Sequence, residues 1–171
     1  EAAIINVRKM VVSALFAALM AICAWISIPV GDTAFTMQTF AVFLALGVLG
    51  GKWGTTSILV YLLLGAVGIP VFSAFRGGLG ALAGPTGGYL WGFLAAGLVY
   101  WGFEKLCKPL GVLLAIVLCY TCGCLWFMYY AGGTAGFVAA VVKCVLPYLI
   151  PDAVKLWLAY TLSNRIGKHI K

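Results

Sequence analysis

Long apolar stretches alternate along the chain with short breaks rich in charged residues, Gly or Pro. A helix needs about 20 apolar residues to cross a hydrocarbon core about 30 Å thick, and six stretches have suitable length and composition. None shows the alternation of apolar and polar residues that a membrane β-barrel requires. We therefore predict six transmembrane helices, at residues 11–30, 35–50, 55–72, 88–103, 111–131 and 145–162.

The composition agrees with a membrane protein. Hydrophobic residues make up 64% of the chain and charged residues 9%, and the mean hydropathy is +1.12. This is too apolar for an ordinary soluble domain, so we expect the lipid bilayer to surround the chain. Lipid cannot satisfy unpaired backbone groups, whereas a helix satisfies its own. We expect residues 1–171 to form one all-α domain, a bundle of six transmembrane helices.

The first apolar stretch, residues 11–30, could be mistaken for a signal peptide because basic residues precede it. Its apolar run is long, however, and no cleavage site of small residues follows. We therefore expect this stretch to remain in the mature chain as the first transmembrane helix.

The formal net charge of +7 would suggest nucleic acid binding in a soluble protein. With six spans, most of the basic residues fall on one side of the membrane instead. Because cytoplasmic loops carry the excess of Lys and Arg, we expect both termini to be cytoplasmic and expect no nucleic acid partner. The basic residues on that side are Arg8, Lys9, Lys52, Lys105, Lys108, Arg165, Lys168 and Lys171, and those on the other are Arg76 and Lys143.

Two charged residues, Asp152 and Lys155, lie within the last predicted helix. Residues three apart share one face of a helix. A charged side chain near the bilayer centre costs roughly 2.5–3.5 kcal/mol and usually faces a bundle interior or a cavity. The pair is therefore the first candidate for a ligand site. The other interpretation is an ion pair that neutralises itself and only holds helices together.

The connection at residues 69–90 is both glycine-rich and aromatic. Glycine lets backbone donors approach a bound molecule closely. Phe72, Phe75 and Tyr89 would enclose apolar groups, and Arg76 would meet an anion. The alternative is a flexible connector, although such linkers are usually rich in Ser and poor in aromatic residues.

Small residues recur at four-residue spacing in the first predicted helix. Ala14 with Ala18, and Ala17 with Ala21, form two neighbouring strips. Such spacing lets two helices approach closely within a membrane. The strips either pack inside the bundle or form a docking face for another membrane protein.

The six cysteines do not indicate a metal centre. Cys119, Cys122 and Cys124 come closest to the spacing of metal ligands, but no histidine or second cysteine pair is near, and a helix turns Cys124 away from Cys122. We expect these cysteines to be small packing residues. The sequence thus predicts no metal and no cofactor.

Catalytic motifs are also missing from the sequence. No two acidic residues are close together and no Ser-His arrangement is present, so an intramembrane enzyme is not favoured. Gly51-Lys52-Trp53 lacks the hydroxyl residue of a P-loop, so ATP-driven transport would take its ATPase from another subunit. The acidic residues are Glu1, Asp32, Glu104 and Asp152.

Four segments carry a family resemblance: 37–42 (MQTFAV), 62–72 (LLLGAVGIPVF), 84–90 (GPTGGYL) and 151–155 (PDAVK). Together they resemble the BioY family, the biotin-specific substrate-binding (S) components of energy-coupling factor (ECF) transporters. The resemblance covers nearly the whole chain, and the last two segments are its most specific part.

The resemblance implies six helices, capture of biotin on the extracytoplasmic side, and partnership with a transmembrane coupling subunit and two cytoplasmic ATPases. It matches Asp152 and Lys155 to the acidic and basic residues that meet the vitamin, and the alanine strips to a motif that contacts the coupling subunit. The predicted substrate-binding residues are Asp152, Lys155, Arg76, Phe75, Gly84, Pro85, Thr86, Gly87, Tyr89, Gln38 and Phe35.

Biotin has a cyclic urea, an apolar sulfur ring and a distal carboxylate. An ionised Asp152 would accept hydrogen bonds from the urea N–H groups, and Lys155 would donate to the urea carbonyl; a hydrogen bond to a charged group contributes about 1.5–3 kcal/mol. If Pro151 opens the last helix, unpaired backbone donors beside Asp152 would favour its negative charge. Arg76 would neutralise the biotin carboxylate.

A self-sufficient secondary carrier for a small vitamin-like carboxylate is the alternative function. Such carriers are commonly built from inverted repeats with matching broken helices, and the sequence has no such internal symmetry. Uptake by this chain alone, driven by an ion gradient, would favour the carrier.

Overall fold

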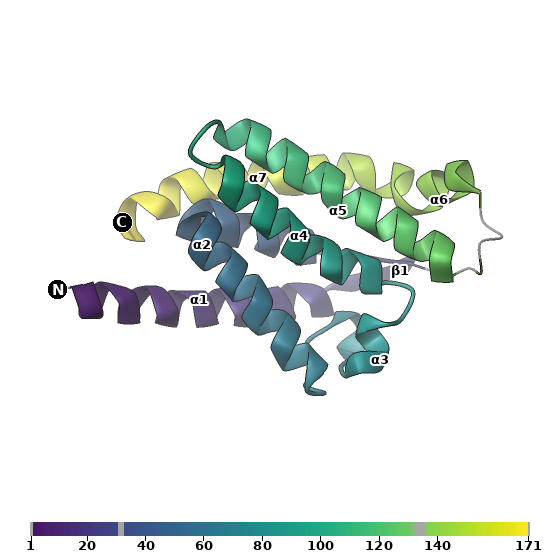
Figure 1. Cartoon of the computed structure of the whole chain (residues 1–171), viewed down its shortest axis with the longest axis horizontal. Coiled ribbons are helices and arrows are strands. Elements are labelled where there is room, and N and C mark those ends of the chain that lie inside the picture. The colour runs from purple at the N-terminus through teal and green to yellow at the C-terminus, as the bar shows by residue number, and fades with distance from the viewer. Residues whose placement is uncertain (1, 31–32, 131, 133–135, 171) are drawn as a thin grey trace.

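The computed structural model describes residues 2–30, 33–130, 132 and 136–170, and they fold into a bundle of helices with one small β-hairpin (Figure 1). The all-α prediction is confirmed by this architecture. The elements in chain order are α1 (Ala2–Trp25), β1 (Ser27–Val30), β2 (Thr33–Thr36), α2 (Gln38–Ala66), the 3₁₀ turn η1 (Ser73–Phe75), α3 (Leu79–Leu82), α4 (Gly87–Phe103), α5 (Lys108–Tyr130), α6 (Phe137–Cys144) and α7 (Leu146–Ile170).

Helix α2 is a pair of helices that fold back on each other at Gly50. This glycine has φ 79° and ψ 173°, which are not helical. A Cβ built on Gly54 would lie only 2.8 Å from the Cα of Leu46, whereas eight residues of straight helix span about 12 Å. Further from the turn, Gln38 hydrogen-bonds to Tyr61. The two halves, 38–49 and 51–66, therefore run antiparallel and correspond to the second and third predicted helices.

The first predicted helix is wrong at its C-terminal end. Helix α1 ends at Trp25, and the strands β1 (27–30) and β2 (33–36) pair antiparallel, with Ser27 opposite Thr36 and Ile28 opposite Phe35. Pro29 disfavours a helical conformation at the residue before it, which explains why the helix does not reach residue 30. Phe35, expected to begin a helix, lies instead on a strand.

The third and sixth predicted helices also have different limits. The helix predicted at 55–72 ends at Ala66, because Gly68 takes a positive φ of 105° and Pro70 follows. The loop after it folds back, and the Gly78 N–H donates to the Gly65 carbonyl at 2.7 Å. Before the last helix lies the short helix α6, which was not predicted. Pro151 lies inside α7 and does not open it, contrary to expectation.

The main core joins α1, α2, α4, α5 and α7. Its most deeply buried large side chains include Met20, Leu46, Ile58 and Tyr61. Glycine lets α4 approach α5, since a Cβ on Gly92 would lie 3.0 Å from the Cys119 carbonyl oxygen. This close contact fixes the relative positions of α4 and α5, which both contribute residues to the site described below.

Among the described residues, three helical segments are long and apolar enough to cross a membrane: Val7–Trp25, Gln38–Ala66 and Lys108–Tyr130. The ends of α1 and α7 that are near the chain termini lie at the same end of the bundle as the turn between α4 and α5, and α6 lies at the opposite end (Figure 1). A cleft at the end of the bundle near the chain termini is lined by Arg8, Lys9, Lys105 and Lys108.

Candidate substrate-binding site

A cavity lies between β2, α2, α4, α5 and α7, with the loop before α4 along one side. It encloses about 680 Å³, its open mouth included. Its wall combines aromatic side chains with a few polar groups, which is typical of a small-molecule site. The lining residues are Phe35, Thr36, Gln38, Thr39, Phe72, Ser73, Thr86, Tyr89, Leu90, Phe93, Ile116, Cys119, Tyr120, Tyr148, Asp152 and Lys155.

Asp152 and Lys155 form a buried ion pair in the wall of this cavity. They lie on the same face of α7, and Lys155 Nζ is 2.7 Å from Asp152 Oδ1. The exposed fractions of the two residues are 6% and 4%. Each charge lowers the cost of burying the other, and burial of either charge alone would be unfavourable.

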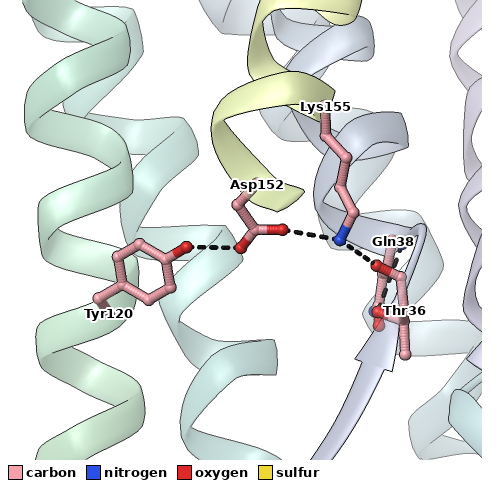
Figure 2. Close-up of polar contacts among 5 residues, drawn as sticks. All are labelled: Thr36, Gln38, Tyr120, Asp152 and Lys155. Carbon is pink, nitrogen blue, oxygen red and sulfur yellow. Dashed lines mark hydrogen bonds and ion pairs between the residues drawn. The ribbon is translucent and has the colours of Figure 1, made fainter. Parts of the chain in front are cut away.

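Contacts from two other parts of the chain, α5 and β2, hold the pair in position, and Figure 2 shows the hydrogen bonds among them. The Tyr120 hydroxyl on α5 donates to Asp152 Oδ2 at 2.5 Å, and Lys155 Nζ donates to the Thr36 carbonyl at 2.6 Å. Lys155 Nζ also lies 3.7 Å from the centroid of the Phe35 ring, a distance suited to a cation–π interaction. Both carboxylate oxygens of Asp152 thus accept hydrogen bonds from side chains of the protein.

A second polar group comes from α2. Gln38 is buried, and its side-chain nitrogen donates to the Tyr61 hydroxyl at 2.7 Å. That hydroxyl donates in turn to the Val71 carbonyl at 3.0 Å. This chain of hydrogen bonds joins both halves of α2 to the loop after it and fixes the amide of Gln38 at the cavity wall.

Six aromatic side chains belong to the cavity wall. Phe35 stacks on Tyr148 of α7, with ring centroids 6.2 Å apart and planes 7° apart. Tyr89 of α4 donates its hydroxyl hydrogen to the Cys144 carbonyl at 2.6 Å, which ties α4 to the end of α6. Phe72 packs edge-on against Tyr61. The rings give the cavity an apolar surface beside its charged pair.

The Gly-Pro-Thr-Gly segment before α4 shapes the cavity more than it lines it. Thr86 is in the lining, whereas Gly84, Pro85 and Gly87 are not. The Trp126 indole donates to the Gly84 carbonyl at 2.9 Å. A Cβ on Gly87 would lie 2.8 Å from the carbonyl carbon of Leu82. The glycines therefore allow a tight turn that brings Thr86 and Tyr89 to the site.

Phe75 and Arg76 lie outside the lining of the cavity. Phe75 is 63% exposed and stacks on Trp25 at 5.1 Å between ring centroids. Arg76 is exposed, and its backbone carbonyl accepts a hydrogen bond from the Phe72 N–H. Contact of these two side chains with a ligand stays a prediction.

The two alanine strips of α1 have different surroundings. Ala17 and Ala21 are buried in the core, with exposed fractions of 2% and 6%. Ala14 and Ala18 are exposed on the outer side of α1. Only the Ala14 and Ala18 strip is therefore available on this surface for a partner.

Sequence reasoning missed three residues that contact the ion pair or its aromatic neighbour. Tyr148 precedes Asp152 by four positions and Lys155 by seven, so helical periodicity could have identified it. Tyr120 approaches from another helix, and the Thr36 carbonyl comes from an unexpected strand. No local sequence pattern predicts either contact.

Within residues 2–30, 33–130, 132 and 136–170, no group of three or more His, Cys, Asp or Glu side chains could hold a metal ion.

Comparisons with known proteins relate the chain to one family and one fold. The model of the BioY family matches residues 1–171. A protein of Thermotoga maritima named "Biotin transporter BioY" is 51% identical over 54% of each chain, and a "Probable biotin transporter BioY" of Pyrococcus horikoshii is 39% identical over 90% of this chain and 92% of its own. The fold matches the crystal structure of an S-component for biotin from an ECF-type ABC transporter with a TM-score of 0.87, at 24% identity, over 95% of this chain and 92% of that one. The chain belongs to the BioY family.

Proposed function

We propose that this protein captures biotin on the extracytoplasmic side of a prokaryotic cell membrane and delivers it inward as the S component of an ATP-driven ECF transporter. The observation that carries the proposal is the buried Asp152–Lys155 pair in the wall of a cavity that aromatic and polar side chains line together. Membership of the BioY family and the names of the relatives supply the ligand.

The chemistry of the cavity suits the bicyclic ring of biotin. Asp152 accepts hydrogen bonds from the urea N–H groups, and Lys155 donates to the urea carbonyl. Lys155 donates a hydrogen bond to Asp152. The urea therefore either inserts between the two side chains or bonds to the carboxylate lone pairs and ammonium hydrogens that this bond does not use. Phe35, Tyr89 and Tyr148 then pack on the apolar sulfur ring.

The remaining predicted residues have supporting roles in this proposal. Gln38 and Thr86 line the cavity and offer polar contacts, while Gly84, Pro85 and Gly87 form the turn before α4. The loop with Phe75 and Arg76 closes over bound biotin, and Arg76 meets the carboxylate at the mouth. This arrangement requires the exposed loop to move toward the cavity when the ligand binds.

The orientation follows from the charges. Six crossings arise if each half of α2 spans the membrane together with α1, α4, α5 and α7. The positive-inside rule assigns the end with both termini and the α4–α5 turn to the cytoplasm. The cavity then opens toward the other side, where biotin arrives.

The S component has no need of its own ATPase or catalytic groups in this scheme. A transmembrane coupling subunit docks on the exposed strip of Ala14 and Ala18, and two cytoplasmic ATPases drive the cycle. With biotin enclosed, the bundle reorients against the coupling subunit and releases the vitamin inward. Bulky side chains on the strip would block this contact.

The proposal is tested by equilibrium titration of the detergent-purified chain with biotin, dethiobiotin and biotin amide. Saturable 1:1 binding of biotin is expected without any partner subunit. Retained binding of the amide would show that the carboxylate is not essential, and weaker binding of dethiobiotin, which keeps the urea but lacks the sulfur, would measure what the sulfur ring contributes. No binding by folded, monodisperse protein would contradict the proposal, and uptake by the chain alone along an ion gradient would favour a secondary carrier.

A further inference from the structure

A second cleft lies at the end of the bundle that holds both chain termini. It is formed by α1, the turn of α2 at Gly50 and the α4–α5 connection, and it encloses about 1350 Å³, its open mouth included. No described residue lines both this cleft and the aromatic cavity. What is inferred for it does not depend on biotin capture.

The cleft carries a net positive charge. Arg8, Lys9, Lys105 and Lys108 line it with a single acidic residue, Glu104, for a net charge of +3. The Glu104 carboxylate accepts the Gly51 N–H at 2.5 Å, so it is already used to hold α4 against the turn of α2. Arg8 also has an interaction within the chain. Because that interaction already engages Arg8, the inference rests on the three lysines.

Exposed apolar side chains lie close in sequence to the lysines of the cleft. Phe103, Leu106 and Leu110 are exposed along the α4–α5 connection that supplies Lys105 and Lys108. A free small anion would gain nothing from these side chains. A molecule with a negative head and apolar chains matches both features, and basic pockets at the ends of transmembrane helices commonly bind such lipid head groups.

The positive-inside rule alone does not explain the arrangement. It requires basic residues on one side of the membrane but not their convergence on one hollow. Lys52 and Arg165 belong to the same set of basic residues and lie outside the cleft lining. Lys9, Lys105 and Lys108 come instead from three different helices or connections and share one cleft.

We propose that this cleft binds the phosphate head group of an anionic phospholipid, with the acyl chains along Phe103, Leu106 and Leu110. The lysine ammonium groups donate to the phosphate oxygens. The lipid fills the junction between α1, α2 and the α4–α5 connection and thereby holds these elements together on the cytoplasmic side.

Native mass spectrometry of the full chain, released from detergent with equal amounts of phosphatidylglycerol and phosphatidylcholine, tests the proposal. We expect wild type to retain phosphatidylglycerol preferentially and Lys105→Gln/Lys108→Gln to lower the ratio of the two bound lipids by about tenfold. The control Lys52→Gln/Arg165→Gln removes the same charge outside the cleft and should keep the ratio. Lys105→Arg/Lys108→Arg should also keep it, which separates loss of charge from loss of fold.

Three results would overturn the lipid assignment. They are an unchanged ratio in Lys105→Gln/Lys108→Gln, an equal fall in the control, and displacement of phosphatidylglycerol by glycerol phosphate at equal concentration, which would indicate a site for free phosphate. If the cleft variant with an unchanged ratio also fails to join its partner subunits, the cleft is a protein interface.

Discussion

The ammonium of Lys155 lies 2.6 Å from the backbone carbonyl of Thr36, although 119 positions separate the two residues along the chain. This hydrogen bond joins α7 to the β-hairpin and completes the wall around the ion pair. Because Thr36 contributes its main chain, the bond depends on the position of the hairpin. A ligand that draws Lys155 away from Thr36 therefore loosens the hairpin beside the cavity.

Asp152→Asn should weaken biotin binding at least tenfold, which is about 1.4 kcal/mol. The variant keeps the shape of the side chain but loses the negative charge that accepts the urea N–H groups. Isothermal titration of the purified chain measures the change. Lys52→Gln serves as the control and should bind like wild type. It changes a charge at an exposed position beside the turn of α2 at Gly50, outside the cavity lining.

Removing both charges separates ligand recognition from a purely structural ion pair. Breaking a buried pair by one substitution typically costs about 3–5 kcal/mol, whereas removing both charges is often nearly neutral. Asp152→Asn/Lys155→Met should therefore unfold at a higher temperature than Lys155→Met alone, yet bind no biotin. Wild-type affinity in the double variant would mean that the pair only holds helices together.

Tyr120→Phe should lower biotin affinity by roughly tenfold, because a hydrogen bond to a charged group contributes about 1.5–3 kcal/mol. The ring remains in place, so the cavity keeps its shape while Asp152 loses one fixed partner. Tyr129→Phe changes an exposed tyrosine on the same helix and is the matched control. Equal affinity in both variants would show that Tyr120 does not position Asp152.

Ala14→Leu or Ala18→Leu should abolish biotin uptake by the assembled transporter while leaving binding by the isolated chain intact. Ala153→Leu, at an exposed alanine of α7, should leave uptake unchanged. Ala17→Leu should destabilise the chain itself, since overpacking a core costs about 1–3 kcal/mol. Uptake and co-purification of the coupling subunit are the readouts, and survival of both in the Ala14 and Ala18 variants would remove the docking role.

Gly87→Ala should destabilise the chain by about 1–3 kcal/mol and weaken biotin binding, since the added Cβ would strike the Leu82 carbonyl group. At Gly80 a Cβ would have nothing within 4 Å, so Gly80→Ala should have little effect on either. Thermal unfolding in detergent compares the two. Equal stability would show that the turn before α4 does not depend on glycine at position 87.

The sequence located most of the helices because apolar length and charge breaks are local features, but it gave other limits for the first, third and sixth helices and missed α6. It missed that Ser27–Val30 leaves the first predicted helix and pairs with Thr33–Thr36, although Pro29 disfavours a helical conformation at the residue before it. The ion pair was predictable from its spacing, and Tyr148 lay within reach of the same periodicity. Tyr120 and Thr36 were not predictable, because their positions depend on packing between α5, α7 and β2. Phe75 and Arg76 are the opposite case. Their residue types suited a ligand site, but they lie outside the cavity lining.

A structure of the chain with bound biotin tests most directly whether the buried charges recognise the vitamin. We expect the urea ring beside α7, with a urea nitrogen within hydrogen-bond distance of Asp152 and the urea oxygen within reach of Lys155 Nζ, about 2.7–3.2 Å in each case. Biotin bound elsewhere, with the Asp152–Lys155 and Lys155–Thr36 contacts unchanged, would contradict that recognition.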